Sequence, residues 1–364
     1  MLKKKSAVID FGSSKITVAI GERGVNHTFL IKARKEIEYD GFSERTFLST
    51  ESVSRALYSA KEFIFNSQKD VETIYVGVPG AFTEVVVKDS QISFPKKKRI
   101  TEEDVDRLFD GAFVLSSAKY TLINRSAIVY ELDDYRRLAN PIGNVSAILK
   151  GKLSFIVCAN YFIDTVRPLL ASSTDYKVEF VSTALAEAMF LLDAETRDKT
   201  AMLVDVGYIS TCFTLIQGDG ILYQNSFDYG GGYVTAVLSE KYDIDFSTAE
   251  KLKRKINLTK TETGYYGLIE VDGEYYPEDE VIKYVKDSLD VLCEGISDSI
   301  ERSGYAIPEY VGLMITGGGV AYLRGAKEHV SGRVGAITEI VSPSVPLMSK
   351  PTESSLLSIL DLVL

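Results

Sequence analysis

Two short segments of this 364-residue chain combine an apolar strand, an aspartate and a glycine turn. The first spans residues 7–14 and contains Asp10 and Gly12, and the second spans residues 203–207 and contains Asp205. Backbone N–H groups that converge at such a turn bind phosphate oxygens, and two carboxylates tolerate proximity when Mg²⁺ and phosphates lie between them. An isolated Asp-x-Gly turn is usually an ordinary β-turn, but its duplication predicts two loops that clamp one phosphate chain.

The first turn offers further phosphate ligands. Ser13 and Ser14 supply hydroxyls beside the backbone N–H groups, and Lys15 adds a positive charge. In each copy a second strand follows the turn, at residues 15–20 and 211–216. We therefore expect two strand-turn-strand hairpins that open two pseudo-symmetric lobes.

A third glycine-rich segment lies near the end of the chain. Gly317, Gly318 and Gly319 follow an apolar strand at residues 311–316 and precede a helical pattern that begins near Ala321. Backbone without side chains lets a planar ring or a ribose approach closely. This pattern alone is weak evidence for a ligand site.

The sequence lacks the motifs of several other kinds of nucleotide, catalytic and metal site. The sequence has neither a P-loop motif nor a G-x-G-x-x-G after its first strand, and its two histidines, His27 and His329, lie beside no serine or cysteine nucleophile. Cys158, Cys212 and Cys293 are widely spaced, which favours reduced thiols over metal ligands or disulfides. A net charge of -10 disfavours nucleic acid as a partner.

The lengths and patterns of the segments predict an α/β protein in which these loops lie on two lobes. Residues 53–64 form an amphipathic helix pattern, a long helix is expected at about 278–303, and the apolar residues 356–360 suit a buried last helix. The predicted division is 1–81 with 160–197 as the first lobe, 82–159 as an inserted subdomain, 198–239 with 304–364 as the second lobe, and 240–303 as its smaller subdomain.

The inserted subdomain contains two local signals. Thr101 can cap a helix whose first turn is acidic, through Glu102 and Asp104. Residues 95–99, Pro-Lys-Lys-Lys-Arg, read as a solvated loop more readily than as a binding site.

The motifs together resemble, in order and along nearly the whole chain, those of the bacterial cell-division protein FtsA, an actin homologue. The inserted subdomain carries the most specific likeness: residues 100–105 and 140–143 are similar to the Ile-Thr-x-x-Asp-Ile and Asp-Pro-Ile-Gly patterns of the FtsA domain called 1C. The remaining matches are residues 8–15 and 203–211 to the two phosphate motifs, 228–235 to a glycine turn, 249–253 to an Ala-Glu-x-x-Lys helix and 317–321 to the adenosine motif.

This resemblance implies a two-lobed, actin-like ATPase fold with duplicated ribonuclease-H-like cores, the 1C subdomain, and a site for ATP and Mg²⁺. It assigns Glu250 and Lys253 to ribose and adenine, and Asp10 and Asp205 to Mg²⁺ through water. The implied nucleotide contacts are Asp10, Gly12, Ser13, Ser14, Lys15, Asp205, Gly207, Tyr208, Ser210, Thr211, Gly230, Gly231, Gly232, Glu250, Lys253, Gly317, Gly318, Gly319 and Val320.

The resemblance also implies a cytoskeletal role at the inner face of the cell membrane. Such a protein polymerises head to tail, contacts other division proteins through 1C, and binds the acidic tail of the tubulin-like protein FtsZ. We expect the tail to dock on the basic cluster around Arg254 and Lys255, which extends from Lys251 to Lys260.

Two departures from the FtsA pattern affect these expectations. Tyr208 and Ile209 replace glycines of the second phosphate loop, so hydrolysis is expected to be slow or undetectable. The chain also stops at Leu364, before the linker and membrane helix usual in FtsA, which predicts either a truncated chain or a divergent member that reaches the membrane only peripherally.

Two alternatives stay open. PilM, an actin-like protein of type IV pilus assembly, shares a 1C-like insertion and binds a partner's N-terminal peptide. A sugar kinase of the same fold would need a carboxylate base, for which Glu187 is the nearest candidate, although a polar position on a half-buried helix explains it as well.

Overall fold

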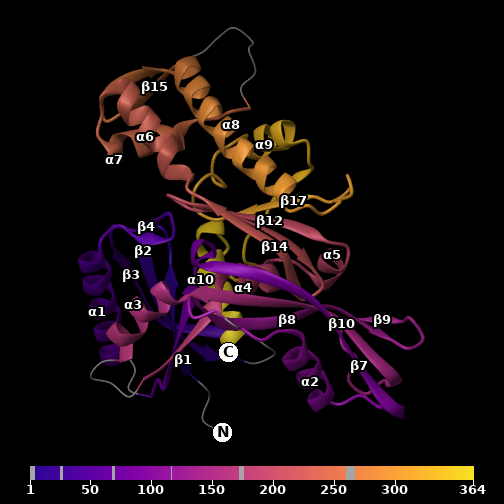
Figure 1. The fold of residues 1–364 in the computed structure, drawn as a ribbon. Coiled ribbons are helices and arrows are strands. Elements are labelled where there is room, and N and C mark those ends of the chain that lie inside the picture. Colours follow the sequence, from indigo (N-terminus) through magenta and orange to yellow (C-terminus); the bar gives the residue numbers. More distant parts are fainter. Residues whose placement is uncertain (1–4, 25–27, 68–69, 116, 172–175, 260–266) are drawn as a thin grey trace.

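The computed structural model describes residues 5–24, 28–67, 70–115, 117–171, 176–259 and 267–364. It has two lobes and a subdomain that projects sideways from the first lobe (Figure 1). The first lobe contains the indigo segments at the start of the chain and the yellow helix at its end, and the second lobe contains most of the salmon to orange segments. His27 and Lys260 lie outside the described residues.

The first lobe is centred on a five-stranded sheet with the order β11-β6-β1-β2-β3. β1 pairs antiparallel with β2 and parallel with β6, so the first predicted hairpin lies at the centre of the sheet. Successive side chains of β1 and β2 point to opposite faces of the sheet, and nearly all of them are buried, so both faces of the sheet are covered at these strands. The strands are β1 (Lys5–Phe11), β2 (Lys15–Arg23), β3 (Phe29–Glu38), β6 (Thr73–Val78) and β11 (Lys177–Ser182), with the small hairpin β4 (Phe42–Ser43) and β5 (Thr46–Phe47) after β3.

Helices cover both faces of this sheet. α1 (Thr50–Ser67) and α3 (Asn160–Ala171) bury their apolar sides on one face, and α1 does so through the predicted residues Val53, Leu57 and Ile64. The other face is covered by α10 (Ser354–Val363) together with α4 (Thr183–Leu191), which packs against it.

The inserted subdomain is a four-stranded antiparallel sheet with the order β7-β10-β8-β9 and one helix, α2, on its face. Thr101 caps α2 as predicted, because its side chain accepts from the Asp104 N–H while Asp104 bonds back to Thr101. The elements are β7 (Thr83–Arg99), α2 (Glu102–Ala112), β8 (Tyr120–Leu132), β9 (Arg137–Leu138) and β10 (Val145–Ala159).

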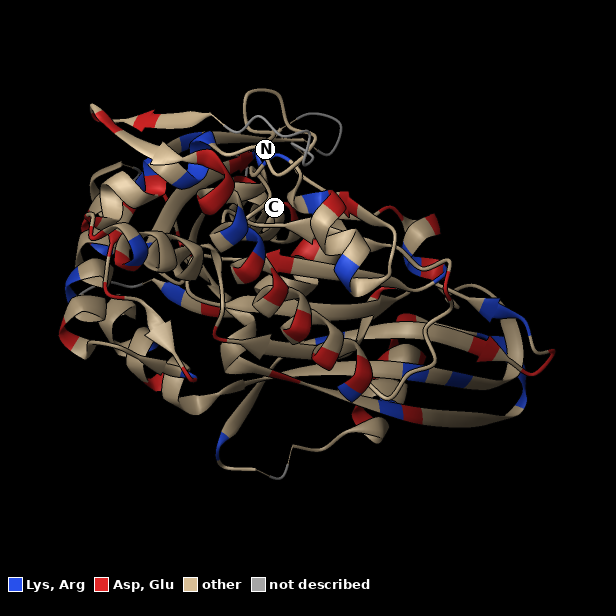
Figure 2. Cartoon of the chain, turned by 90° about the horizontal axis from the view of Figure 1, so that it is seen from above, with Lys and Arg blue, Asp and Glu red and all other residues tan. Residues whose placement is uncertain are grey.

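The basic run at residues 96–99 is not the loop that the sequence suggested. It forms the end of β7, where Lys98 and Arg99 pair with Ser146 and Val145 of β10 and the side chains face solvent. Basic and acidic residues are both present along the strands of this subdomain (Figure 2), and Lys97 and Lys98 pair with Asp133 and Asp104.

The second lobe repeats the pattern of the first. Its five-stranded sheet has the order β14-β13-β12-β17-β18, with β12 antiparallel to β13 and parallel to β17, so the second hairpin is again central. The strands are β12 (Ala201–Val206), β13 (Thr211–Gln217), β14 (Gly220–Phe227), β17 (Leu313–Thr316) and β18 (Thr338–Ile340).

A smaller subdomain stands on this lobe. Its helices share one buried apolar cluster with the sheet. α9 begins at Ala326 rather than near Ala321, because Gly325 immediately before it has a φ of 87°. The elements are α6 (Gly231–Tyr242), α7 (Phe246–Lys255), β15 (Leu268–Val271), β16 (Glu274–Pro277) and α8 (Glu278–Arg302). α9 (Ala326–Val334) packs against α8 and β18, and α5 (Ala194–Asp198) packs against β13.

The last helix packs on the first lobe. α10 is buried, as the apolar residues 356–360 suggested, but it packs against β1 and α4 rather than on the second lobe's own sheet. Residues 354–364 therefore belong to the first lobe by their packing, which differs from the predicted division. None of the helices in the described part of the chain is both long enough and apolar enough for a membrane span.

Candidate functional site

The two hairpin turns have the same backbone geometry. In the first, the Gly12 N–H donates to the Lys15 carbonyl at 2.9 Å, and in the second the Gly207 N–H donates to the Ser210 carbonyl at 2.9 Å. A Cβ atom at either glycine would lie within 3 Å of the accepting oxygen. The duplication seen in the sequence is therefore preserved in the hydrogen bonds of the turns.

The two turns also touch each other. The Ile209 N–H donates to Ser13 Oγ at 2.9 Å, which joins the first lobe to the second. A further contact comes from Gly41 of the first lobe, where a Cβ atom would lie 3.1 Å from Ile209 Cδ1 of the second lobe. The lobes are therefore closed on each other at this end.

A cleft of about 340 Å³ lies between the lobes beside these turns. Its walls come from both hairpins, the Gly317 loop, the helix α4 and the start of the C-terminal segment. The predicted residues that line it are Asp10, Gly12, Ser13, Ser14, Lys15, Asp205, Gly207, Tyr208, Ser210, Gly317 and Gly318.

The glycine loops of the second lobe are stacked too closely to admit side chains. Gly317 has a φ of 91°, and a Cβ atom there would lie 2.2 Å from Asp205 Oδ1. A Cβ atom at Gly231 would lie 2.2 Å from the Gly319 carbonyl oxygen, and the Gly231 N–H donates to the Gly207 carbonyl at 2.9 Å. These glycines hold the phosphate loop and the Gly317 loop against each other.

Three carboxyl groups converge on the cleft. Burial raises the pKa of Asp10 to about 6, against the opposing effect of a 2.6 Å hydrogen bond from Ser355 Oγ. Burial, and secondly the charge of Asp10, raise the pKa of Asp205 to about 7. The pKa of Glu187 is raised well above its usual value by burial and by both aspartates. The site thus disfavours further negative charge unless a cation accompanies it.

Several predicted contacts lie behind the wall of the cleft instead of lining it. Lys253 is only 1% exposed, and its Nζ donates to the Gly231 carbonyl and Thr235 Oγ1, each at 2.7 Å, while it pairs with Glu250 at 2.6 Å. Its interactions position the glycine turn, so the structure does not support a direct adenine contact. The other predicted residues outside the lining are Thr211, Gly230, Gly231, Gly232, Glu250, Gly319 and Val320.

Glu250 is likewise committed to protein partners. Its carboxylate accepts from Thr235 Oγ1 at 2.6 Å and from the Tyr322 hydroxyl at 3.1 Å, and it pairs with Arg254 at 2.9 Å. Arg254, which the sequence assigned to partner docking, lines the cleft and stacks over the Tyr322 ring at 4.4 Å. Arg254 is thus the basic side chain that reaches the cleft from α7.

Two other basic side chains of the cluster, among the residues that the structure describes, are paired within the subdomain. Lys251 pairs with Asp272 at 2.8 Å and Lys255 with Glu270 at 3.6 Å. An acidic peptide would have to compete with these carboxylates. The structure therefore weakens the case for peptide docking at this cluster.

Sequence reasoning missed the parts of the cleft that come from distant segments. Pro351, Thr352 and Ser355 reach it from the C-terminal segment, and Thr183 and Ala184 from the start of α4. No motif marks these residues, because their place depends on how α4 and α10 pack between the lobes. Glu187 was recognised only as a candidate base and was expected to be half-buried, whereas it is 2% exposed.

The residues fit a hydrated magnesium ion bound together with phosphates. Asp205 has no ion-pair partner among the described residues, and Asp10 is bonded only by a neutral hydroxyl there. In the same part of the chain, no group of His, Cys, Asp and Glu side chains is arranged to chelate a metal directly. Mg²⁺ would then be held by Asp10 and Asp205 through water.

Comparisons of sequence show a likeness to FtsA along nearly the whole chain. The chain is 20% identical to the cell division protein FtsA of Enterococcus hirae, over 97% of this chain and 81% of that protein. It is also 20% identical to FtsA of Streptococcus pneumoniae, over 96% of this chain and 78% of that protein. A family model described as type IV pilus assembly protein PilM matches residues 174–266.

Comparisons of structure identify the fold. The chain resembles the PilM-PilN type IV pilus biogenesis complex with a TM-score of 0.64 and 14% identity, over 97% of both chains. It resembles MreB5 of Spiroplasma citri bound to ADP with a TM-score of 0.55 and 11% identity, over 98% of this chain and 94% of that one. The predicted actin-like fold is therefore confirmed, and so is the resemblance to FtsA.

Proposed function

We propose that this FtsA-like protein of actin fold is an ATP-binding cytoskeletal scaffold of bacterial cell division. Mg-ATP binds in the cleft between Asp10 and Asp205 and acts as a conformational ligand that favours the closed arrangement of the lobes. The closed form polymerises head to tail and links filaments of FtsZ to the inner face of the cell membrane. The full-length likeness to FtsA supports this choice of process.

The observation that carries the nucleotide part of the proposal is the pair of matching turns at Gly12 and Gly207. Both turns line one cleft, each follows a strand whose penultimate residue is an aspartate, and a glycine loop lies beside them in the cleft wall. Backbone donors and hydroxyls at such turns suit phosphate oxygens. The Gly317 loop leaves room for the ribose and the base.

The direct test is calorimetry with Mg-ATP and the variant Gly318→Arg. Gly318 lines the cleft, so a large side chain there should reduce affinity at least tenfold. Gly332→Arg is a matched control, because nothing lies within 4 Å of a Cβ atom at Gly332 of α9. Equal affinities for wild type and Gly318→Arg would remove the site assignment.

A second function is supported by its own observations. The PilM family model matches residues 174–266, and the PilM-PilN complex shares the fold over 97% of the chain. The alternative is therefore a PilM-like protein of type IV pilus assembly whose partner is a short N-terminal peptide of another assembly protein.

Peptide binding separates the two functions. Fluorescence anisotropy would compare the FtsZ tail peptide with the N-terminal peptide of PilN, each with and without Mg-ATP. Binding of the FtsZ tail alone supports the division role, and binding of the PilN peptide alone supports the pilus role.

The charge reversals Arg254→Glu and Lys255→Glu test whether the FtsZ tail docks on α7. Unchanged affinity for the FtsZ tail would place its binding site elsewhere.

A further inference from the structure

The strands of the inserted subdomain extend sideways beyond both lobes (Figure 1). Their outer end is formed by the last residues of β7, the turn between β8 and β9, and the residues that lead into β10. Val145 of β10 pairs with Arg99 of β7, and the Ala147 N–H donates to Asp133 Oδ2 of the turn at 2.9 Å. We call these three adjacent segments the distal end, which comprises residues 94–99, 133–137 and 140–145.

β7 bulges at the distal end. Its paired residues Ser93 and Lys98 lie opposite Ile148 and Ser146 of β10, so four residues of β7 face the single residue Ala147. The four are Phe94, Pro95, Lys96 and Lys97. An insertion of this kind pushes residues out of the ladder, and a proline in it has no N–H to donate to a further strand. The bulge therefore projects basic side chains and is poorly suited to pairing with another strand.

Basic side chains gather at the distal end (Figure 2). Three of them have a carboxylate partner: Lys97 with Asp133 at 3.1 Å, Lys98 with Asp104 at 2.8 Å, and Arg136 with Asp134 at 2.7 Å. Three more are exposed and have no ion-pair partner among the described residues, namely Lys96, Arg99 and Arg137. The chain as a whole has a net charge of -10, so these unpaired basic groups stand out from the rest of the molecule.

The acidic start of α2 lies on one face of this sheet. Glu102 and Glu103 are in the first turn of α2, which packs on the sheet together with Leu138 of β9. Arg137 precedes Leu138 in β9, so its side chain points to the opposite face. An anionic surface can therefore approach the Arg137 side of the distal end without meeting the two glutamates.

Exposed apolar side chains accompany the basic ones. Tyr135 lies in the turn between β8 and β9 with a φ of 63° and is 78% exposed, while Val145 and Ile142 are 51% and 42% exposed. A tyrosine ring with its hydroxyl suits the boundary between water and lipid headgroups. Lysine and arginine beside such residues are typical of surfaces that contact anionic membranes.

We propose that the distal end of the inserted subdomain binds the surface of an anionic membrane. Lys96, Arg99 and Arg137 attract the lipid phosphates, and Tyr135 places its ring among the headgroups. This inference deepens the function proposed above, because it names the part of this chain that contacts the membrane. A membrane fits a projecting, bulged end better than an acidic peptide does, because peptides dock in grooves or along strand edges.

Co-sedimentation with lipid vesicles is the first test. Wild type should bind vesicles of equal parts phosphatidylcholine and phosphatidylglycerol, but not phosphatidylcholine alone, and added salt should release it. Each basic side chain at a membrane surface contributes roughly fivefold, so Lys96→Glu with Arg99→Glu should weaken binding at least about 30-fold. The matched control is Arg55→Glu with Lys283→Glu, which reverses two exposed basic residues of α1 and α8 that have no ion-pair partner among the described residues. The control should bind as wild type does.

The sequence contains no tryptophan, which provides a second readout. Tyr135→Trp introduces a single tryptophan in the turn between β8 and β9, and its emission should shift to shorter wavelength when anionic vesicles are added, because the indole leaves water. Tyr58→Trp is the control, because Tyr58 is 64% exposed on α1 and lies outside the distal end. Its emission should not change with vesicles. Thermal unfolding checks that each variant is folded.

The contrary outcomes are distinct. The membrane assignment is overturned if wild type does not bind anionic vesicles, or if the reversal of Lys96 and Arg99 leaves binding unchanged. A response of Tyr135→Trp to polyglutamate but not to vesicles would also overturn it, and would assign the distal end to an acidic protein segment. Mg-ATP calorimetry on the same samples keeps the two proposals apart: normal Mg-ATP affinity without vesicle binding removes only the membrane assignment, whereas wild type that fails to bind Mg-ATP removes the proposed nucleotide function.

Discussion

At the scale of single residues, the cleft gathers three acidic groups that form no direct ion pair with a basic side chain of the described residues. Asp10 and Glu187 are buried and Asp205 is half-buried, and the pKa of each is raised. Ionisation of these carboxyl groups lowers the free energy of unfolding, because their charged forms are less stable in the folded protein than in the unfolded chain. Mg²⁺ and nucleotide would offset this cost, so the residues link binding to stability.

The stability of the nucleotide-free protein should therefore fall as pH rises from about 5 to about 8 in the presence of a chelator. These carboxyl groups bind protons more tightly in the folded state, so their stabilising effect is lost as pH rises through their folded pKa values. Since one pKa unit corresponds to about 1.4 kcal/mol, we expect a loss on the order of 1–3 kcal/mol. Denaturant unfolding at several pH values measures it.

Asp205→Asn provides the comparison for this pH series. Its amide cannot ionise, so the fall in stability should be smaller than in wild type. Carboxyl groups of lowered pKa, such as Asp104, are already ionised at pH 5 in both states and should not contribute in this range. Identical pH profiles for the two proteins would contradict this account of Asp205.

The second phosphate turn predicts slow turnover. The Ile209 N–H already donates to Ser13 Oγ, and the Gly232 N–H already donates to the Tyr208 carbonyl at 2.7 Å. Backbone used in this way is less available to a terminal phosphate. Steady-state phosphate release should stay well below about one per second, and a rate typical of a metabolic kinase would contradict this expectation.

At the scale of elements, the sequence predicted what local patterns determine. The hairpins at Gly12 and Gly207 and the capped helix at Thr101 follow from short segments, and the structure contains each of them. The sequence did not predict that Lys253 is buried under the glycine turn or that Ser355 bonds to Asp10, because these contacts join segments 22 and 345 residues apart. Such contacts depend on the packing of helices that no motif specifies.

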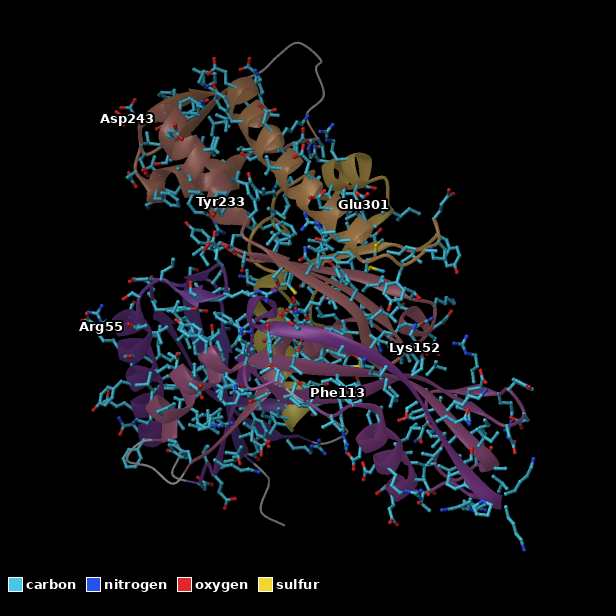
Figure 3. The ribbon with its side chains drawn as sticks, viewed as in Figure 1. Arg55, Phe113, Lys152, Tyr233, Asp243 and Glu301 are labelled. Atoms are coloured by element: carbon cyan, nitrogen blue, oxygen red, sulfur yellow. The ribbon has the colours of Figure 1, made fainter. Side chains whose placement is uncertain are left out.

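One such contact links the lobes across the mouth of the cleft. At the tip of the β4–β5 hairpin, Ser43 Oγ and the Glu44 N–H each donate to Asp228 Oδ2 at 2.7 Å. Phe42 anchors the hairpin in the first lobe's core. Beside Asp228, the rings of Tyr229 and Tyr233 stack with centroids 4.9 Å apart, and Tyr233 lies on the side of α6 that faces the first lobe (Figure 3).

Asp228→Asn should loosen this link. Hydrogen bonds to a charged acceptor contribute about 1.5–3 kcal/mol, and an amide oxygen retains part of that. Hydrogen exchange at the Glu44 amide should become roughly tenfold faster, with little change in the core of either sheet. Asp272→Asn, which breaks only the surface pair with Lys251, is the control. Equal exchange at Glu44 in wild type and Asp228→Asn would show that Asp228 does not hold the hairpin.

At the scale of the whole molecule, the two lobes and the inserted subdomain form an actin-like body. The hairpin β15–β16 lies at the outer end of the smaller subdomain (Figure 1). Its buried side is formed by Ile269, Val271 and Tyr276, while Leu268 and Tyr275 are 65% and 64% exposed. Exposed apolar side chains that lie together are typical of protein interfaces.

We therefore expect the β15–β16 hairpin to contribute to head-to-tail contacts between copies of this chain. A heterologous contact of this kind produces open filaments, and Mg-ATP should promote them by favouring closed lobes. Leu268→Glu would place a charge in the contact and should raise the critical concentration for assembly at least tenfold, without changing Mg-ATP affinity. Tyr310→Glu is the control, because Tyr310 is 72% exposed and lies before β17, away from the hairpin. Sedimentation would measure assembly, and electron microscopy on a lipid monolayer would show filaments and membrane contact together. If Leu268→Glu forms normal filaments, this hairpin is not part of the interface.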